Sequence, residues 1–96
     1  MKSRYFSEEV KNFEDIPNVG RRVARDFRKL GFSKPIELLG KDPFALYMKL
    51  NKLDGKRHDP CLLDVFMSVA DYVSGSQARP WWFYTKQRKM EYFDRY

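Results

Sequence analysis

Residues 16–31 read Ile-Pro-Asn-Val-Gly-Arg-Arg-Val-Ala-Arg-Asp-Phe-Arg-Lys-Leu-Gly, a short turn that leads directly into an arginine-rich segment. Pro17 lacks a backbone donor and restricts the residues before it, so the chain turns here instead of continuing a helix. From Val19 or Gly20 onward, apolar residues recur at the spacing of an amphipathic helix: Val23, Ala24, Phe27 and Leu30. Gly31 is a typical residue to end such a helix. This stretch therefore predicts a turn followed by a helix over residues 19–30.

Similar signals divide the rest of the chain into helices. Helix-capping residues stand near the expected starts, and a proline follows the cap in Asp42-Pro43 and Asp59-Pro60. We expect five helices, over residues 7–14, 19–30, 36–39, 43–54 and 60–73, and no segment alternates cleanly enough to predict a strand. The predicted fold is a compact all-α five-helix domain spanning residues 1–96, with its core at about 7–85 and a basic, aromatic tail at 86–96.

Composition excludes several classes of protein. No run approaches the length of about 18 apolar residues that a membrane span requires, and Glu8, Glu9, Glu14 and Asp15 break up any signal-peptide core. The single cysteine, Cys61, cannot form an internal disulfide. We expect a cytoplasmic protein without a membrane partner.

Positive charge is concentrated in two parts of the chain. The net charge is +6, of which residues 21–29 carry +4 and residues 79–96 carry +3, while residues 30–78 are neutral and residues 1–20 carry −1. A concentrated basic patch is more typical of nucleic-acid binding than evenly spread charge is.

The turn before the helix has the chemistry of an anion site. The first N–H groups of a helix lack intrahelical partners and carry about half a positive charge, and a glycine allows a phosphate to approach closely. The candidate nucleic-acid contacts are Asn18, Val19, Gly20, Arg21, Arg22 and Arg25. Such contacts give affinity without reading bases.

These residues resemble the helix-hairpin-helix motif, in which a hairpin between two helices binds the backbone of DNA or RNA. The resemblance covers about residues 10–38 and implies that Val19 anchors the hairpin while Gly20 contacts phosphate. The connector over residues 54–59 lacks the Pro-x-apolar-Gly order of the first hairpin, so we interpret it as a degenerate second hairpin.

Downstream residues resemble a narrower family. His58-Asp59-Pro60-Cys61-Leu62-Leu63-Asp64-Val65-Phe66, then Pro80-Trp81-Trp82-Phe83-Tyr84-Thr85 and Arg88-Lys89, are similar to the bacterial pathogenicity-locus family, whose members are also labelled mitomycin-resistance-like. This resemblance covers most of residues 13–89 and implies a bacterial helix-hairpin-helix protein, but it defines no biochemical activity.

The aromatic cluster Trp81-Trp82-Phe83-Tyr84 has two interpretations. Four large aromatic residues after a core helix are typical of a lid over the core, with one Trp ring left exposed; they could also stack on unpaired bases or contact a protein. Secondary nucleic-acid contacts are accordingly predicted at Lys56, Arg57, His58, Trp81, Trp82, Arg88 and Lys89.

Catalytic and metal chemistry are not indicated. His58, Asp59 and Cys61 are residue types that bind zinc, and a Cys-His pair can support covalent catalysis, but no second Cys/His cluster completes a site. No nucleotide loop, nucleophile elbow or paired-carboxylate pattern is present. We expect a non-enzymatic protein with no cofactor, metal or small-molecule substrate, which binds DNA or RNA backbone without sequence specificity. The alternative is an adaptor that docks on another protein through its aromatic C-terminal segment.

Overall fold

The computed structural model describes residues 10–92, and this part of the chain is entirely helical. It contains four α-helices: α1 (Arg21–Lys29), α2 (Pro43–Asp54), α3 (Cys61–Val73) and α4 (Thr85–Glu91). Three short 3-10 helices, η1 (Phe13–Asp15), η2 (Pro35–Leu38) and η3 (Trp81–Tyr84), lie between or before them. The all-α prediction is confirmed for these residues, whereas the four α-helices of residues 10–92 do not support the expected count of five.

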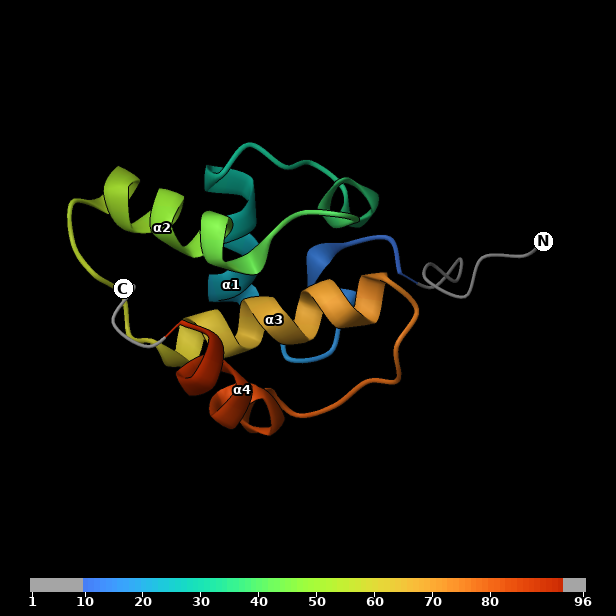
Figure 1. Cartoon of the computed structure of the whole chain (residues 1–96). Helices are drawn as coiled ribbons and strands as arrows, with labels where there is room; N and C mark the ends of the chain where they lie inside the picture. Colours follow the sequence, from blue (N-terminus) through green and yellow to red (C-terminus); the bar gives the residue numbers. More distant parts are fainter. Residues whose placement is uncertain (1–9, 93–96) are drawn as a thin grey trace.

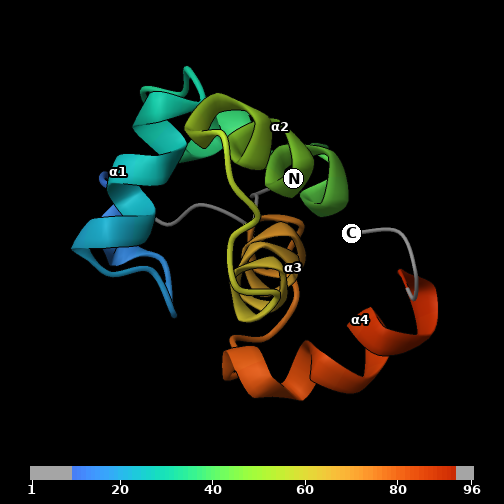
Figure 2. The same cartoon turned by 90° about the vertical axis from the view of Figure 1, so that its left-hand side faces the viewer.

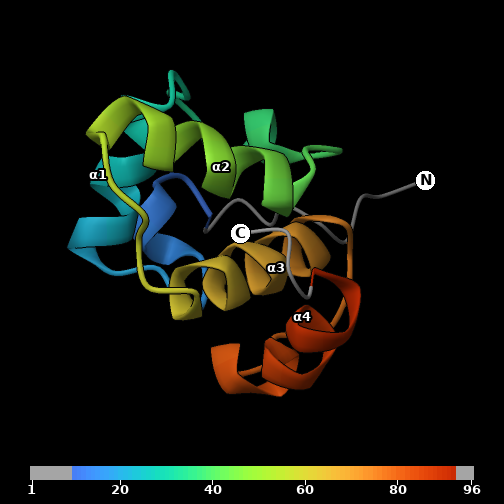
Figure 3. The same cartoon turned by 60° about the vertical axis from the view of Figure 1, so that its left-hand side comes forward.

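Helix α3 is the centre of the fold. In Figure 1 it crosses the middle of the molecule, with α2 on one side and α4 on the other. Figure 2 views α3 nearly along its axis and places α1 beside α2, away from α4. Figure 3 shows the aromatic η3 and α4 beneath α3. The two basic segments of the sequence, α1 and the η3–α4 region, therefore contact different sides of one central helix.

Three aromatic rings connect η1, α1 and α3 through the core. The ring centroids of Phe13 and Phe27 are 5.4 Å apart, and those of Phe27 and Phe66 are 5.2 Å apart. All three side chains are buried, and aromatic pairs at this distance contribute about 0.5–1.5 kcal/mol beyond the area they bury. They hold the inner face of α1 against the core and leave its arginine face toward solvent.

The predicted end of α1 and both predicted ends of α2 are confirmed, whereas α3 begins at Cys61 with Pro60, not Asp59, as its N-cap. Gly31 adopts φ +102°, and the N–H of Phe32 donates to the carbonyl of Phe27 at 3.1 Å, the bond of a Schellman cap on α1. Asp42 caps α2 by accepting from the N–H of Ala45 at 3.3 Å, and Gly55 ends α2 in the left-handed region. The cap-plus-proline prediction for α2 is confirmed.

Two of the predicted helices differ from the structure. Residues 7–9 of the helix expected over 7–14 lie outside the described residues; the part that is described becomes helical only in the single 3-10 turn η1. The helix expected over 36–39 is the 3-10 helix η2. An α-helix is therefore not seen on both sides of the Asn18–Gly20 turn in the described residues, and the structure does not support the helix-hairpin-helix description.

The segment expected as a tail contains α4, which packs on α3. Nε of Arg88 lies 2.5 Å from Oδ1 of Asp64, and the Thr85 hydroxyl donates to Oδ2 of the same carboxylate at 2.6 Å. Asp64 and Arg88 are both buried. This polar contact holds α4 against α3.

Within residues 10–92, every helix is too short or too polar to span a membrane.

Candidate functional site

The turn before α1 is held in place by its own backbone and by a distant segment. Val19 N–H donates to the Ile16 carbonyl at 3.1 Å, with Pro17 and Asn18 (φ +72°) at the two central positions, as in a type II turn. The Asn18 side-chain amide donates to the Ser68 hydroxyl at 3.2 Å and to the Arg79 carbonyl at 2.6 Å. Val19 is buried, as the sequence predicts. Asn18 and Val19 thus position the turn, and their hydrogen-bonding groups are largely occupied.

The start of α1 leaves its backbone donors unused. Gly20 is the N-cap and makes no side-chain cap, and the N–H groups of residues 20–23 have no hydrogen-bond partner in the described structure. The first turn contains no acidic residue. Instead it carries Arg21 and Arg22, although positive charge is unfavourable at a helix N-terminus. No acidic residue of the first turn balances this charge, and the described residues form no ion pair with either arginine.

Gly20 has no evident role in the fold. Four of the five glycines have positive φ, but Gly20 has φ −95° and ψ −168°, which any residue can adopt. A Cβ atom built on Gly20 would meet no atom within 4 Å. The absence of a side chain therefore leaves open space in front of four unpaired N–H groups.

The arginines of α1 fall into two groups. Arg21, Arg22 and Arg25 are exposed and make no ion pair with the described residues. Arg28 instead lies 3.2 Å from Glu14 and over the ring of Phe13, and Lys29 lies 2.8 Å from Asp54. The unpaired cations are those nearest Gly20. We call the residues 20–22 together with Arg25 the α1 N-terminal site.

A polar groove of about 390 Å³ runs beside this site, between α1 and the connector from α2 to α3. The His58 ring is buried in its floor, with Nε2 2.6 Å from Oδ2 of Asp54. Hydrogen bonds from Lys29 and then His58 lower the pKa of Asp54. The rest of the lining is Arg22, Arg25, Asp26, Lys29 and Lys56. The groove therefore contains one acid, Asp54, that is paired with Lys29 and His58, and it has the unpaired Arg22 and Arg25 along its edge.

Asp26 is an unusual member of this groove. Its Oδ2 atom is buried without a hydrogen-bond partner. Burial raises the pKa of its carboxyl group, while the charges of His58, Lys29 and Arg22 oppose that shift. Asp26 could not be identified from the sequence, because a lone acid in a basic helix is most often a surface residue.

The predicted secondary contacts are spread over two regions. His58 is buried, whereas Lys56 and Arg57 are exposed beside the polar groove. Trp81 is half-buried, Trp82 is 63% exposed and Tyr84 is buried, as the lid interpretation with one exposed Trp ring expects. Phe83 is also more than half exposed, and there the lid interpretation is wrong. Lys89 is exposed on α4. Arg88 is buried against Asp64, so its side chain is not presented to nucleic acid at the surface.

Within residues 10–92 no three His, Cys, Asp or Glu side chains come together as a group that could hold a metal ion. Cys61, at the start of α3, is half-buried. Burial and a hydrogen bond with Asp59 raise the pKa of its thiol, which favours the unreactive form.

Comparison with known proteins assigns the family. Residues 7–90 match the family described as "Pathogenicity locus". The chain belongs to this family. It is also 43% identical over 83 residues to the mitomycin resistance protein McrB of Streptomyces lavendulae, a match that covers 86% of this chain and 79% of that protein. No solved structure matches the chain.

Proposed function

We propose that this member of the pathogenicity locus family is a non-enzymatic module that binds the phosphate backbone of DNA or RNA through the α1 N-terminal site. The proposed contacts are the N–H groups at Gly20, Arg21 and Arg22, with the guanidinium groups of Arg21, Arg22 and Arg25 around them. A cytoplasmic location fits this role, because that is where a bacterial protein meets nucleic acid.

The observation that carries the proposal is the combination found at one helix end. Gly20 is required neither by its backbone angles nor by packing, the N–H groups of residues 20–23 are unpaired, and arginines occupy the first turn where acidic residues are favoured. Each of these departs from what would best stabilise α1. A bound phosphate accounts for all three, since it accepts from the N–H groups, needs the open space and neutralises the arginines. Departures of this kind are typical of functional sites.

The site supports backbone binding without base recognition. Phosphate contacts of this kind give dissociation constants of about 10⁻⁴–10⁻⁶ M at physiological salt, and the affinity falls steeply as salt rises. Lys56 and Arg25, along the edge of the polar groove, are placed to contact a neighbouring phosphate.

Fluorescence anisotropy with labelled duplex and single-stranded oligonucleotides at low and moderate salt tests the proposal. We expect binding that does not depend on base sequence. Gly20→Ser is the decisive variant, because serine is a better N-cap than glycine but its hydroxyl occupies the N–H groups that the phosphate needs. It should bind about tenfold more weakly, a change of about 1.4 kcal/mol, while remaining at least as stable as the original protein.

Two outcomes would reject the proposal or its site. Absence of binding to every oligonucleotide at low salt removes the function, and unchanged affinity in Gly20→Ser moves the contact away from α1. Gly20→Glu, which adds a negative charge at the same point, should abolish binding and serves as the stronger version of the test.

A second function is favoured by a different observation. Trp82, Phe83 and Met90 are all more than half exposed on η3 and α4, and exposed apolar groups of this size are typical of protein contacts. As the alternative, we propose an adaptor that binds a protein partner through this surface. Met90→Ala would weaken capture of such a partner and leave oligonucleotide affinity unchanged, because Met90 lies in neither proposed nucleic-acid site.

A further inference from the structure

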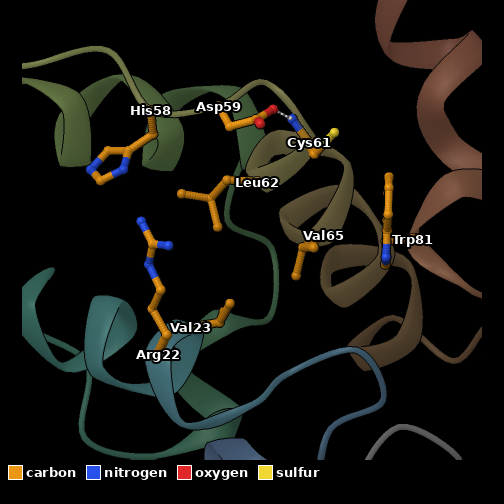
Figure 4. A pocket seen from close by; sticks show the side chains of 8 residues that line it. All are labelled: Arg22, Val23, His58, Asp59, Cys61, Leu62, Val65 and Trp81. Atoms are coloured by element: carbon orange, nitrogen blue, oxygen red, sulfur yellow. Dashed lines mark hydrogen bonds between the residues drawn. The ribbon is translucent and has the colours of Figure 1, made fainter.

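A cleft of about 280 Å³ opens between the start of α1 and the start of α3. Figure 4 shows Arg22 extending from α1 toward His58, with Val23 beside it and Leu62 opposite. Val65 and Trp81 line the other end, so the cleft brings together α1, α3 and the aromatic η3. We call it the α1–α3 cleft.

The walls of this cleft suit a flat apolar ring. Val23, Leu62, Val65 and the indole of Trp81 supply most of the lining. The other lining residues are Arg22, Cys61 and the loop residues His58 and Asp59. The ring of Trp82 meets the indole of Trp81 edge-on at a centroid distance of 5.6 Å. The cleft is smaller than most ligand sites, which occupy about 300–1,000 Å³. It has room for one ring system and is too small for a helix or a duplex.

Arg22 connects this cleft with the proposed phosphate site. Its backbone N–H is one of the unpaired donors at the start of α1, and its side chain lines the cleft. A ligand that fills both places must join an apolar ring to an anion a few bonds away. A nucleotide unit has this construction, and its base can leave the stack only in a single strand or at an unpaired position.

We propose that the α1–α3 cleft binds one unstacked nucleobase of a single-stranded nucleic acid whose backbone phosphate lies at the α1 N-terminal site. This inference rests on the proposed function and adds the substrate class, a single strand in preference to a duplex. Trp81 provides the stacking surface, Leu62 and Val65 enclose the ring, and Arg22 contacts the phosphate side of the same nucleotide. Recognition of this kind tolerates any base, because every base has an aromatic face.

The test compares three labelled probes at low salt: a 12-nucleotide thymidine strand, a strand of the same length made of abasic sites, and a duplex. The abasic strand keeps the phosphates and lacks the bases. We expect the thymidine strand to bind between about 5-fold and about 150-fold more tightly than the abasic strand, the range that stacking of one base supplies. Trp81→Ala should remove this difference and leave binding of the abasic strand and the duplex unchanged.

Phe83→Ala is the matched control, because Phe83 is an exposed aromatic residue of the same 3-10 helix that does not line the cleft. It should keep the preference for the thymidine strand. A second measurement does not depend on truncating Trp81: in Trp82→Phe, where Trp81 is the remaining tryptophan, the thymidine strand should quench the fluorescence and the abasic strand should not.

The outcomes separate the two proposals. If no probe binds, the backbone function itself is rejected. If the thymidine and abasic strands bind equally, or if Phe83→Ala loses the preference as Trp81→Ala does, the backbone function stands and the base-binding cleft is rejected.

Discussion

The side-chain amide of Asn18 donates a hydrogen bond to the backbone carbonyl of Arg79 at a distance of 2.6 Å. The two residues are 61 positions apart in the chain, and the same amide reaches the Ser68 hydroxyl on α3. The bond joins the turn before α1 to the segment that leads into Trp81. It therefore holds the proposed phosphate site and the proposed base site in a fixed relation.

Two substitutions at Asn18 separate this bond from the backbone conformation. Asn18→Gly keeps a residue that accepts φ +72° and removes the amide, so the free energy of unfolding should fall by about 1–2 kcal/mol. Asn18→Ala keeps the β-carbon in the left-handed region but lacks the polar side chain that lets asparagine adopt it, so it should be about 1–2 kcal/mol less stable than Asn18→Gly. Urea unfolding measures both. Equal stability of Asn18→Gly and the original protein would show that the amide bonds contribute nothing to the fold.

The contact between Asp64 and Arg88 makes a stronger prediction. Arg88→Met leaves the Asp64 carboxylate buried with only the Thr85 hydroxyl as a partner among the bonds described above, and should lower the free energy of unfolding by about 3–5 kcal/mol. The double variant Asp64→Leu with Arg88→Met removes both charges. It should recover most of that loss, because a buried ion pair can often be replaced by apolar residues without cost.

Urea unfolding followed by circular dichroism checks this pair of variants. If Arg88→Met proves as stable as the original protein, α4 is not held on α3 by this contact. If the double variant is less stable than Arg88→Met, the two charges do not act as a pair.

The same contact explains why the sequence did not predict α4. A short helix is recognised by an apolar stripe at helical spacing, but the inward residue of α4 is the charged Arg88. Its partner Asp64 lies 24 residues away, so no local pattern reports the pairing. In contrast, α2 is bounded by Asp42 and Gly55, whose effects are local, and its ends were predicted to within a residue.

The candidate site was predictable to a similar extent. The exposed arginines and the glycine at the start of α1 follow from the order of residues 19–25, and the structure adds that Gly20 is not required by the fold. That Trp81 and Arg22 line the same cleft could not be predicted, because this arrangement depends on tertiary contacts such as the bond between Asn18 and Arg79. The 3-10 geometry of η1 was missed for a related reason: Val10 and Phe13 have helical spacing, but Asp15 caps the backbone at residues 11 and 12 and so starts the helical turn only at Phe13.

Asp26 should make stability depend on pH in a sense opposite to that of most carboxyl groups. Because burial raises its pKa in the folded state, the folded protein holds this proton to a higher pH than the unfolded chain does. The ionised Asp26 carboxylate is therefore the form that destabilises the fold. Its unfavourable contribution to stability is absent below the unfolded pKa of about 3.9, and it grows as pH rises through the folded pKa. Asp26→Asn should be more stable than the original protein at pH 7, and this advantage should vanish near pH 3.

Asp54→Asn is the control of opposite sign. Hydrogen bonds from Lys29 and His58 lower the pKa of Asp54, so its contribution is favourable above the unfolded pKa and is lost as pH falls through the folded pKa. This variant should be less stable than the original protein at pH 7, and the difference should become smaller as pH falls toward 3. Urea unfolding at the two pH values measures both variants, and the same pH trend in the two would contradict the assignment of Asp26 as a buried, unpartnered acid.

Arg25 and Arg28 allow the salt dependence of oligonucleotide binding to be assigned to individual residues. Both lie on α1, but Arg25 has no ion-pair partner in the described chain, whereas Arg28 is paired with Glu14 and lies over Phe13. Loss of a phosphate contact reduces the slope of log affinity against log salt by about 1. We expect this reduction for Arg25→Ala, with a change in unfolding free energy within about 0.5 kcal/mol because the residue is exposed. Arg28→Ala should leave the slope nearly unchanged, since Glu14 already neutralises that charge.

Anisotropy titrations at several salt concentrations measure both slopes. An equal reduction for the two variants would mean that the proposed interface extends over the whole basic face of α1 instead of its N-terminal end.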